Sequence, residues 1–343
     1  NYGDAYVGLA ESQLRHFIES NDATQLLPMA ATVEQLKKVN GQHNLLSYLQ
    51  AELSLNQGDY AQAVELFKKS IGLQPRFLKA YAGLSDAYIE LNEIKMAEDI
   101  LLQAFKLMPN NTTVIANVGA LHYNNGEYNR AINYFELLAQ QVPNNYIAHL
   151  NISACHYLLG DTEQAIIAAE KSISIQPNAD GFANLGTYYF MLKDFNKAVE
   201  AYEQMIALND SDYINWGNLA DAYRFANNSK YIGAFRQAII LSEQAVVLNP
   251  NNKNAIASSA YYYANLDNVD KTQFYAKEID KKDTGADNFL IAAAYVRLNM
   301  KKAAIKHIKS AMNKNYSLAE VANSPLFDDL KEDPEYLKML IIN

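Results

Sequence analysis

The sequence predicts an all-α solenoid built from repeated helix pairs, and three observations lead to this prediction. Prolines recur every 34 residues, small residues keep the same interval, and each interval contains two runs with the apolar spacing of an α-helix. A fixed period of this length is typical of solenoids, in which each repeat packs against its neighbours. The prolines are Pro75, Pro109, Pro143 and Pro177.

The segment 114–143 shows how one repeat is expected to fold. Gly126 separates two helices, and Pro143 ends the second because proline cannot continue a helix. The apolar face of the first helix is formed by Ile115, Val118, Gly119 and His122. The matching face of the second helix is formed by Tyr128, Ala131, Phe135 and Leu138. Helix axes approach closely where side chains are small, so Gly119 and Ala131 predict the contact between the two helices.

The same phase divides the chain into three regions. Residues 1–41 are expected to be a degenerate N-terminal helical pair, in which Pro28 interrupts the pattern. Residues 42–316 are the repeat array, and residues 317–343 are expected to form capping helices because Ser324 and Asp333 each precede a proline. The repeats are placed at 44–77, 78–111, 112–145, 146–178, 179–212, 213–252, 253–284 and 285–316.

The sixth repeat carries six extra residues around Asn227–Ile232. Two interpretations are open: a longer turn or lengthened helix, which we favour, and a loop that contacts a partner.

Many aligned positions make the array resemble the tetratricopeptide repeat (TPR) family. One set of motif residues is Phe182, Leu185, Gly186, Tyr189, Phe195, Ala198 and Tyr202. A second set is Trp216, Leu219, Ala220, Tyr223, Ala238, Ala245 and Pro250. The resemblance implies a right-handed α-α superhelix of about eight helix pairs, whose first helices line a concave groove that binds proteins or peptides.

Composition excludes several classes of function. The formal net charge of −9 gives no basic surface for nucleic acid or anionic membranes, and no apolar run reaches the roughly 18 residues of a membrane span. Cys155 has no second cysteine with which to form a disulfide. No signal peptide is recognised. Because the chain begins at Asn1 and not at Met, we expect a fragment of a longer protein or a processed form.

Four asparagines recur on the stripe expected to face the groove. They are Asn117, Asn151, Asn184 and Asn218, here called the Asn ladder. An amide offers both a donor and an acceptor, which suits the backbone of an extended peptide. The alternative is an inherited residue that hydrogen-bonds to the adjacent repeat.

Six residues after each ladder position comes an aromatic ring or an arginine: Tyr123, Tyr157, Phe190 and Arg224. Such side chains are typical of binding hot spots, but aromatic stripes at helical spacing are more often core, and we favour packing between repeats. Asp221 and Glu52 also fall on the groove stripe, where they would receive a basic side chain or be solvated.

Searches for catalytic and metal sites give no candidate. The sequence lacks phosphate-binding and nucleophile-elbow motifs. His122 and His156 occupy positions where the family has tyrosine and are interpreted as packing residues, and Cys155 as a buried structural thiol. Tyr48 and Glu52 stand where the chaperone-tail-binding subclass of the family needs Lys and Asn. We therefore predict no enzyme, no metal and no cofactor.

The predicted function is a protein-interaction module that holds a peptide or partner protein in the groove. The runs Trp216–Phe225 and Tyr316–Glu320, with Pro325, resemble TPR regions of bacterial signalling proteins linked to kinase, cyclase or winged-helix domains. This resemblance implies a sensory or regulatory region, periplasmic or cytoplasmic, with the periplasm slightly favoured. The alternative is a structural scaffold of an envelope or secretion assembly, which would use convex or cap surfaces and oligomerise.

Overall fold

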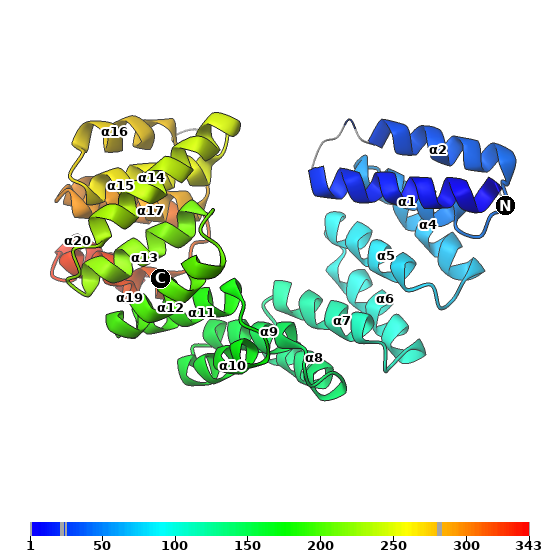
Figure 1. Cartoon of the computed structure of the whole chain (residues 1–343), viewed down its shortest axis with the longest axis horizontal. Coiled ribbons are helices and arrows are strands. Elements are labelled where there is room, and N and C mark those ends of the chain that lie inside the picture. Colours follow the sequence, from blue (N-terminus) through cyan, green and yellow to red (C-terminus); the bar gives the residue numbers. More distant parts are fainter. Residues whose placement is uncertain (1, 21–23, 25, 280–282, 343) are drawn as a thin grey trace. The chain divides into compact units, whose positions relative to one another are not determined.

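The structure is a computed structural model that describes residues 2–20, 24, 26–279 and 283–342. Over these ranges the regular elements are helices and no strand occurs, so the predicted all-α fold is confirmed (Figure 1). The chain divides into two compact units, Asn1–Cys155 and His156–Asn343, which are described separately. Helix α9 (Tyr146–Leu158) crosses the boundary between them.

Unit 1 contains four helix pairs. Each pair joins a first helix to a second helix, and in the last three pairs the connection is a short turn. In chain order they are α1 (Tyr2–Ser20) with α2 (Leu26–Val39), α3 (Leu46–Asn56) with α4 (Tyr60–Leu73), α5 (Leu78–Glu90) with α6 (Ile94–Leu107), and α7 (Thr112–Asn124) with α8 (Tyr128–Gln141).

Unit 2 continues the pattern after α10 (Thr162–Ile175). Its pairs are α11 (Ala179–Met191) with α12 (Phe195–Leu208), α13 (Tyr213–Phe225) with α14 (Tyr231–Leu248), α15 (Lys253–Asn265) with α16 (Val269–Glu278), and α17 (Gly285–Arg297) with α18 (Lys301–Asn313). It ends with α19 (Leu318–Asn323), the 3-10 helix η2 (Pro325–Leu330) and α20 (Pro334–Ile342).

Left-handed backbone at one repeated position ends the first helices. A residue with positive φ stands in each turn within the pairs from α3–α4 onward: Gly58, Asn92, Gly126, Gly160, Lys193, Asn227, Asp267 and Asn299. Glycine adopts this conformation without steric cost and asparagine tolerates it. In three pairs the aspartate that follows then caps the second helix, as Asp194 does by accepting from the N–H of Lys197. The turn is therefore set by position more than by residue type.

Small residues face large rings where the two helices of a pair meet. A Cβ added to Gly119 would lie 2.7 Å from the ring of Phe135, and one added to Gly186 would lie 2.4 Å from the ring of Tyr202. The pairing of small and large side chains that the sequence predicted at Gly119 is therefore present in the structure.

The six extra residues of the sixth repeat are shared between the turn and the second helix. The turn covers residues 226–230, where the preceding pair uses 192–194, and α14 has 18 residues where α12 has 14. The favoured interpretation, a longer turn with a lengthened helix, describes the structure.

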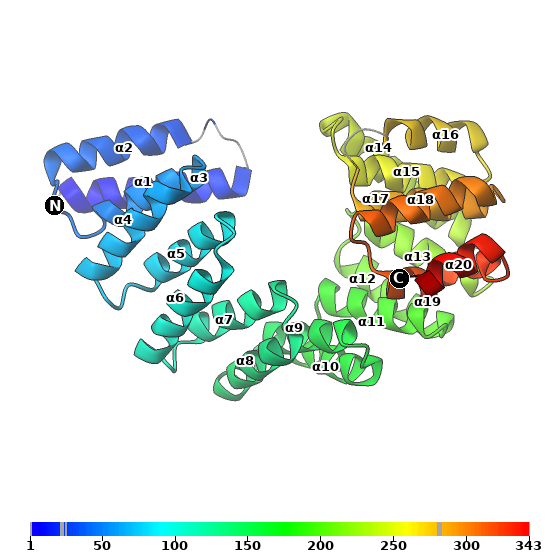
Figure 2. The same cartoon turned by 180° about the vertical axis from the view of Figure 1, so that it is seen from behind.

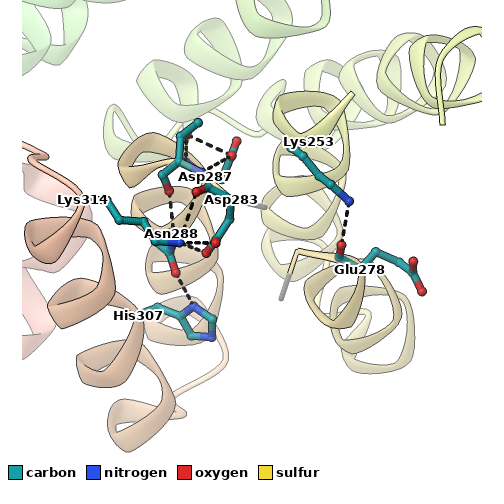
Figure 3. Close-up of polar contacts among 8 residues, drawn as sticks. Lys253, Glu278, Asp283, Asp287, Asn288, His307 and Lys314 are labelled. Carbon is teal, nitrogen blue, oxygen red and sulfur yellow. Dashed lines mark hydrogen bonds and ion pairs between the residues drawn. The ribbon is translucent and has the colours of Figure 1, made fainter. Parts of the chain in front are cut away.

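The last pair packs differently from the earlier ones. First helices α13 and α15 pack on the preceding second helices, whereas α17 packs extensively on α15. A polar network holds the start of α17 to α18: the Nδ1 atom of His307 lies 3.0 Å from Oδ1 of Asn288, and Lys314 pairs with Asp283 (Figure 3). Thr284 and Asp287 close a capping box at the same place.

The C-terminal segment 317–340 folds back inside unit 2. Residues Phe327, Leu330 and Tyr336 are completely buried, and α20 packs against α18 (Figure 2). Asp328 reaches Lys193 in the α11–α12 turn, where the Nζ–Oδ2 distance is 2.7 Å. The segment thus covers more than the final helix pair, and it extends to a repeat 135 residues earlier in the chain.

Candidate binding surface on the first helices

First helices of successive pairs contact one another and so form a common face within each unit. The contacts join α3 to α5 in unit 1, and α11, α13, α15 and α17 in series in unit 2. We call this surface the first-helix face. The ladder asparagines all belong to first helices: Asn117 of α7 and Asn151 of α9 in unit 1, and Asn184 of α11 and Asn218 of α13 in unit 2.

The four ladder asparagines are alike in their exposure and hydrogen bonding. All four side chains belong to partly exposed residues, and within the described part of the chain no hydrogen bond ties any of them to a neighbour. The alternative interpretation requires a hydrogen bond from each asparagine to the adjacent repeat, and these bonds are not present among the described residues. Asn117 lines a cavity of about 190 Å³ in unit 1, together with Ala82 and Asp86 of α5 and Ala120 of α7.

Among the described residues, the two carboxylates of Glu52 and Asp86 on the first helices of unit 1 form no ion pair. Asp86 is exposed, and Glu52 lies one repeat earlier at the same position. Burial raises the pKa of the Glu52 carboxyl to about 7, and the charge of Asp86 adds to this while Tyr48 and Lys79 oppose it. Lys79 itself pairs with Glu11 at 2.8 Å.

Unit 2 encloses a larger cavity of about 320 Å³ between its first helices and the C-terminal segment. Asn218 of the ladder lines it, as do Glu320 and Ser324 of the segment. Its aromatic walls are Tyr157, Phe190, Phe289 and Tyr316, with Tyr202 beneath.

In unit 2, two of the predicted aromatic rings pack between repeats and also line the cavity. Tyr157 stacks on Tyr188 of the next repeat with ring centroids 4.8 Å apart, and Phe190 contacts Phe225 of the next repeat at 5.3 Å. The packing interpretation therefore describes these contacts, but both rings also line the cavity. In unit 1, Tyr123 is partly exposed and contacts Tyr128 of the same pair at 5.8 Å.

Asp221 and Arg224 form an ion pair with each other. Asp221 is only 8% exposed and accepts a hydrogen bond of 2.6 Å from the Tyr261 hydroxyl, while the guanidinium of Arg224 lies 3.5 Å away. Arg224 also stacks on Phe225 at 4.5 Å and lines a separate cavity of about 220 Å³. Sequence spacing placed Asp221 on the groove stripe, but α15 brings Tyr261 over it, so its charge is engaged internally.

Sequence reasoning missed the contribution of the C-terminal segment. Glu320, Tyr316 and Phe289 enter the cavity from elements that lack the repeat pattern or lie four repeats away from Tyr157. The only available signal was the Tyr316–Glu320 run, which we had interpreted as part of a cap.

His122 and Cys155 both lie in the packed interior of the repeats. Among the described residues, no group of three metal-ligating side chains gathers at one place. His122 is buried, with its Nδ1 atom 2.6 Å from Glu127, and burial raises the pKa of the Cys155 thiol to about 11. None of the described helices is both long and apolar enough to span a bilayer.

Comparison with known proteins identifies the repeat. Family models described as tetratricopeptide repeat match residues 54–120, 119–180 and 179–212. No curated protein matches the whole sequence at a significant level.

Solved structures share the fold at low sequence identity. Yeast Tom70 is similar over 94% of this chain and 63% of its own, with a TM-score of 0.59 and 17% identity. The C-terminal part of a TPR repeat-containing protein from Cytophaga hutchinsonii is similar over 76% and 98%, with a TM-score of 0.51 and 18% identity. The Cut9–Hcn1 hetero-tetramer of APC/C matches 83% of this chain and 52% of its own, at a TM-score of 0.50 and 15% identity.

These findings show that the chain carries tetratricopeptide repeats and has their all-α fold. That fold is typical of modules that bind other proteins.

Proposed function

We propose that this chain is a protein-binding module in which the first-helix face of each unit holds an extended peptide segment through the ladder asparagines of that unit. The observation that carries the proposal is the state of the ladder amides: they recur at one position, are partly exposed, and make no hydrogen bond to the described residues. An extended peptide supplies one donor and one acceptor per residue, which these amides complement. The exposed carboxylate of Asp86 favours a peptide with basic residues.

The test is peptide selection followed by affinity measurement. Peptides are selected from a random display library on the wild-type chain, and their affinities are compared with those for an Asn117/Asn151/Asn184/Asn218→Ala variant. Each lost hydrogen bond costs about 0.5–1.5 kcal/mol, so we expect the quadruple variant to bind at least tenfold more weakly.

A matched control replaces four exposed asparagines outside the ladder, Asn110, Asn144, Asn251 and Asn313, by alanine. This variant is expected to bind as the wild type does. If both variants melt normally and bind equally well, the ladder does not hold the peptide.

We further propose that the module is the sensory or regulatory region of a larger bacterial signalling protein. The resemblance of Trp216–Phe225 and Tyr316–Glu320 to such regions supports this role. The alternative, a scaffold that uses its outer or cap surfaces, predicts self-association. Sedimentation equilibrium over a hundredfold range of concentration distinguishes them, because a scaffold would gain mass with concentration and a peptide-binding monomer would not.

A further inference from the structure

Glu320 places a carboxylate in the cavity of unit 2 without a cation to balance it. No ion pair joins Glu320 to a lysine, arginine or histidine of the described residues. Its backbone N–H donates to Oγ of Ser317, its carbonyl accepts from the N–H of Ser324, and the neutral Tyr316 hydroxyl hydrogen-bonds to its carboxylate. The other acid on the cavity wall, Asp221, is held by Arg224 and Tyr261.

The nearest lysines are already paired. Lys193 and Lys331 line an adjoining cavity of about 440 Å³, which shares Tyr157, Met191 and Glu320 with the first. Both lysines bind the carboxylate of Asp328, at 2.7 and 2.8 Å. The negative charge of Glu320 therefore remains available to a ligand.

Aromatic rings surround this charge. Phe289 and Tyr316 pack together at 4.8 Å on one side, and Tyr157 and Phe190 line the same cavity. Burial and the nearby Glu320 carboxylate raise the pKa values of the Tyr157 and Tyr316 hydroxyls, so both stay protonated. Ring faces attract cations, and the attraction strengthens when water is excluded.

We propose that this cavity binds the guanidinium group of an arginine side chain on a partner peptide. The proposal rests on the proposed peptide-binding function and specifies which side chain of the peptide unit 2 would recognise. A guanidinium is planar and stacks on aromatic rings, while its five N–H donors match the carboxylate of Glu320 and the amide oxygen of Asn218. An ammonium is compact and more strongly hydrated, so lysine fits these walls less well.

Other ligand classes leave a group unsatisfied. An apolar ligand would desolvate Glu320 without a partner, and an anion would be repelled by it. A metal ion would need more than the single unpaired carboxylate that lines this cavity.

The test uses small probes that need no groove: N-acetyl-arginine amide, its lysine counterpart, and N-acetyl-citrulline amide, a neutral isostere. Binding to the isotope-labelled chain is followed by NMR titration. We expect the arginine probe to bind about tenfold more tightly than the citrulline probe, with shifts in the Asn218 amide. Glu320→Gln should remove this preference.

Two further variants keep the test decisive. Glu200→Gln removes an exposed carboxylate of α12 that does not line the cavity and should keep the preference. Tyr157→Leu removes a ring and should weaken the arginine probe several-fold, with melting measured for every variant. Equal affinity for arginine and citrulline, a preference that survives in Glu320→Gln, or lysine binding as tightly as arginine would overturn the assignment.

The result of the arginine test can be separated from the result of the Asn ladder test. An Asn117→Ala/Asn151→Ala double variant changes unit 1 alone, so it should weaken selected peptides and leave the arginine probe unaffected. If the wild-type chain binds the arginine and citrulline probes equally while the double variant binds selected peptides more weakly, the arginine site is rejected. That result would leave the proposed peptide-binding function standing.

Discussion

The first-helix faces of the two units share one repeat pattern but differ in what covers them. In unit 1 the face carries exposed Asp86 beside a cavity of about 190 Å³. In unit 2 the residue at the same repeat position, Asp221, is buried, and segment 317–340 helps to enclose a cavity of about 320 Å³. The repeat therefore fixes where a side chain points, while neighbouring elements decide whether a ligand can reach it.

We infer from this difference that the two faces bind different parts of a ligand. The face of unit 1 suits the backbone of an extended chain, because Asn117 and Asp86 are accessible from solvent. The cavity of unit 2, lined by Asn218, Glu320 and aromatic rings, suits a single side chain. The following variants are ordered from the largest expected effect to the smallest, and each one tests this contrast.

Removing a ring from the C-terminal segment should damage unit 2 alone. Phe327 is fully buried and contacts Phe289 at 5.0 Å. Phe327→Ala should lower the free energy of unfolding of unit 2 by about 3–5 kcal/mol. Hydrogen exchange read by mass spectrometry should show lost protection in α11, α13 and α17 and unchanged protection in α3 and α5. Leu337→Ala, at a 42% exposed position of α20, is the control. Equal loss in both units would show that they do not unfold separately.

The equivalent aspartates should respond very differently to alanine. Asp221→Ala leaves the Tyr261 hydroxyl and the Arg224 guanidinium without their buried partner, which should cost about 2–3 kcal/mol of stability. Asp86→Ala removes an exposed carboxylate and should change stability by less than about 0.5 kcal/mol. Urea denaturation of the two variants measures both values. Similar losses would mean that the two faces are equally covered.

Stability of unit 1 should depend on pH through Glu52. Its pKa is about 7 in the folded chain, against 4.5 for an ordinary glutamate, so folding favours the protonated form. The resulting stabilisation is complete below pH 4.5 and is lost as the pH rises through 7. Relative to Glu52→Gln, the wild type should lose about 1 kcal/mol or more between pH 5 and pH 8. Denaturation at several pH values measures this, with Glu136→Gln as an exposed control; a parallel pH profile for wild type and Glu52→Gln would contradict it.

The ion pair between Lys193 and Asp328 should contribute least. Both side chains are about half exposed, so Lys193→Ala should lower stability by at most about 1 kcal/mol, and 1 M salt should abolish the difference. Lys193→Arg should keep the contact. Melting temperatures at low and high salt are the measurement. A loss that persists in high salt would indicate that Lys193 stabilises the segment by packing and not by charge.

The fold was predictable because its signals are local and repeated. Pro109, Pro143 and the small residue Gly119 mark helix ends and close helix contacts within some 30 residues of sequence, and the structure places helices accordingly. Even the irregular sixth repeat was visible as an interval that is six residues too long.

The cavity was not predictable because its walls come from distant parts of the chain. No periodic pattern links Asp328 to Lys193, and nothing near Asp221 indicates that Tyr261 lies over it. The ladder position identified Asn218 correctly as a lining residue, but the acid beside it, Glu320, belongs to a segment outside the repeat phase.

The reach of the C-terminal segment also bears on how the chain is made. A ribosome synthesises Lys193 135 residues before its partner Asp328 in the C-terminal segment, which also carries the buried residues Phe327, Leu330 and Tyr336. Until the C-terminal segment is made, the apolar surface that Phe327, Leu330 and Tyr336 bury is open to solvent, and exposed surface of this kind promotes aggregation. Unit 1 has all its own pairs by residue 141 and need not wait. Translation stops or truncations late in the gene should therefore yield a chain with a sound N-terminal half and a C-terminal half that depends on chaperones.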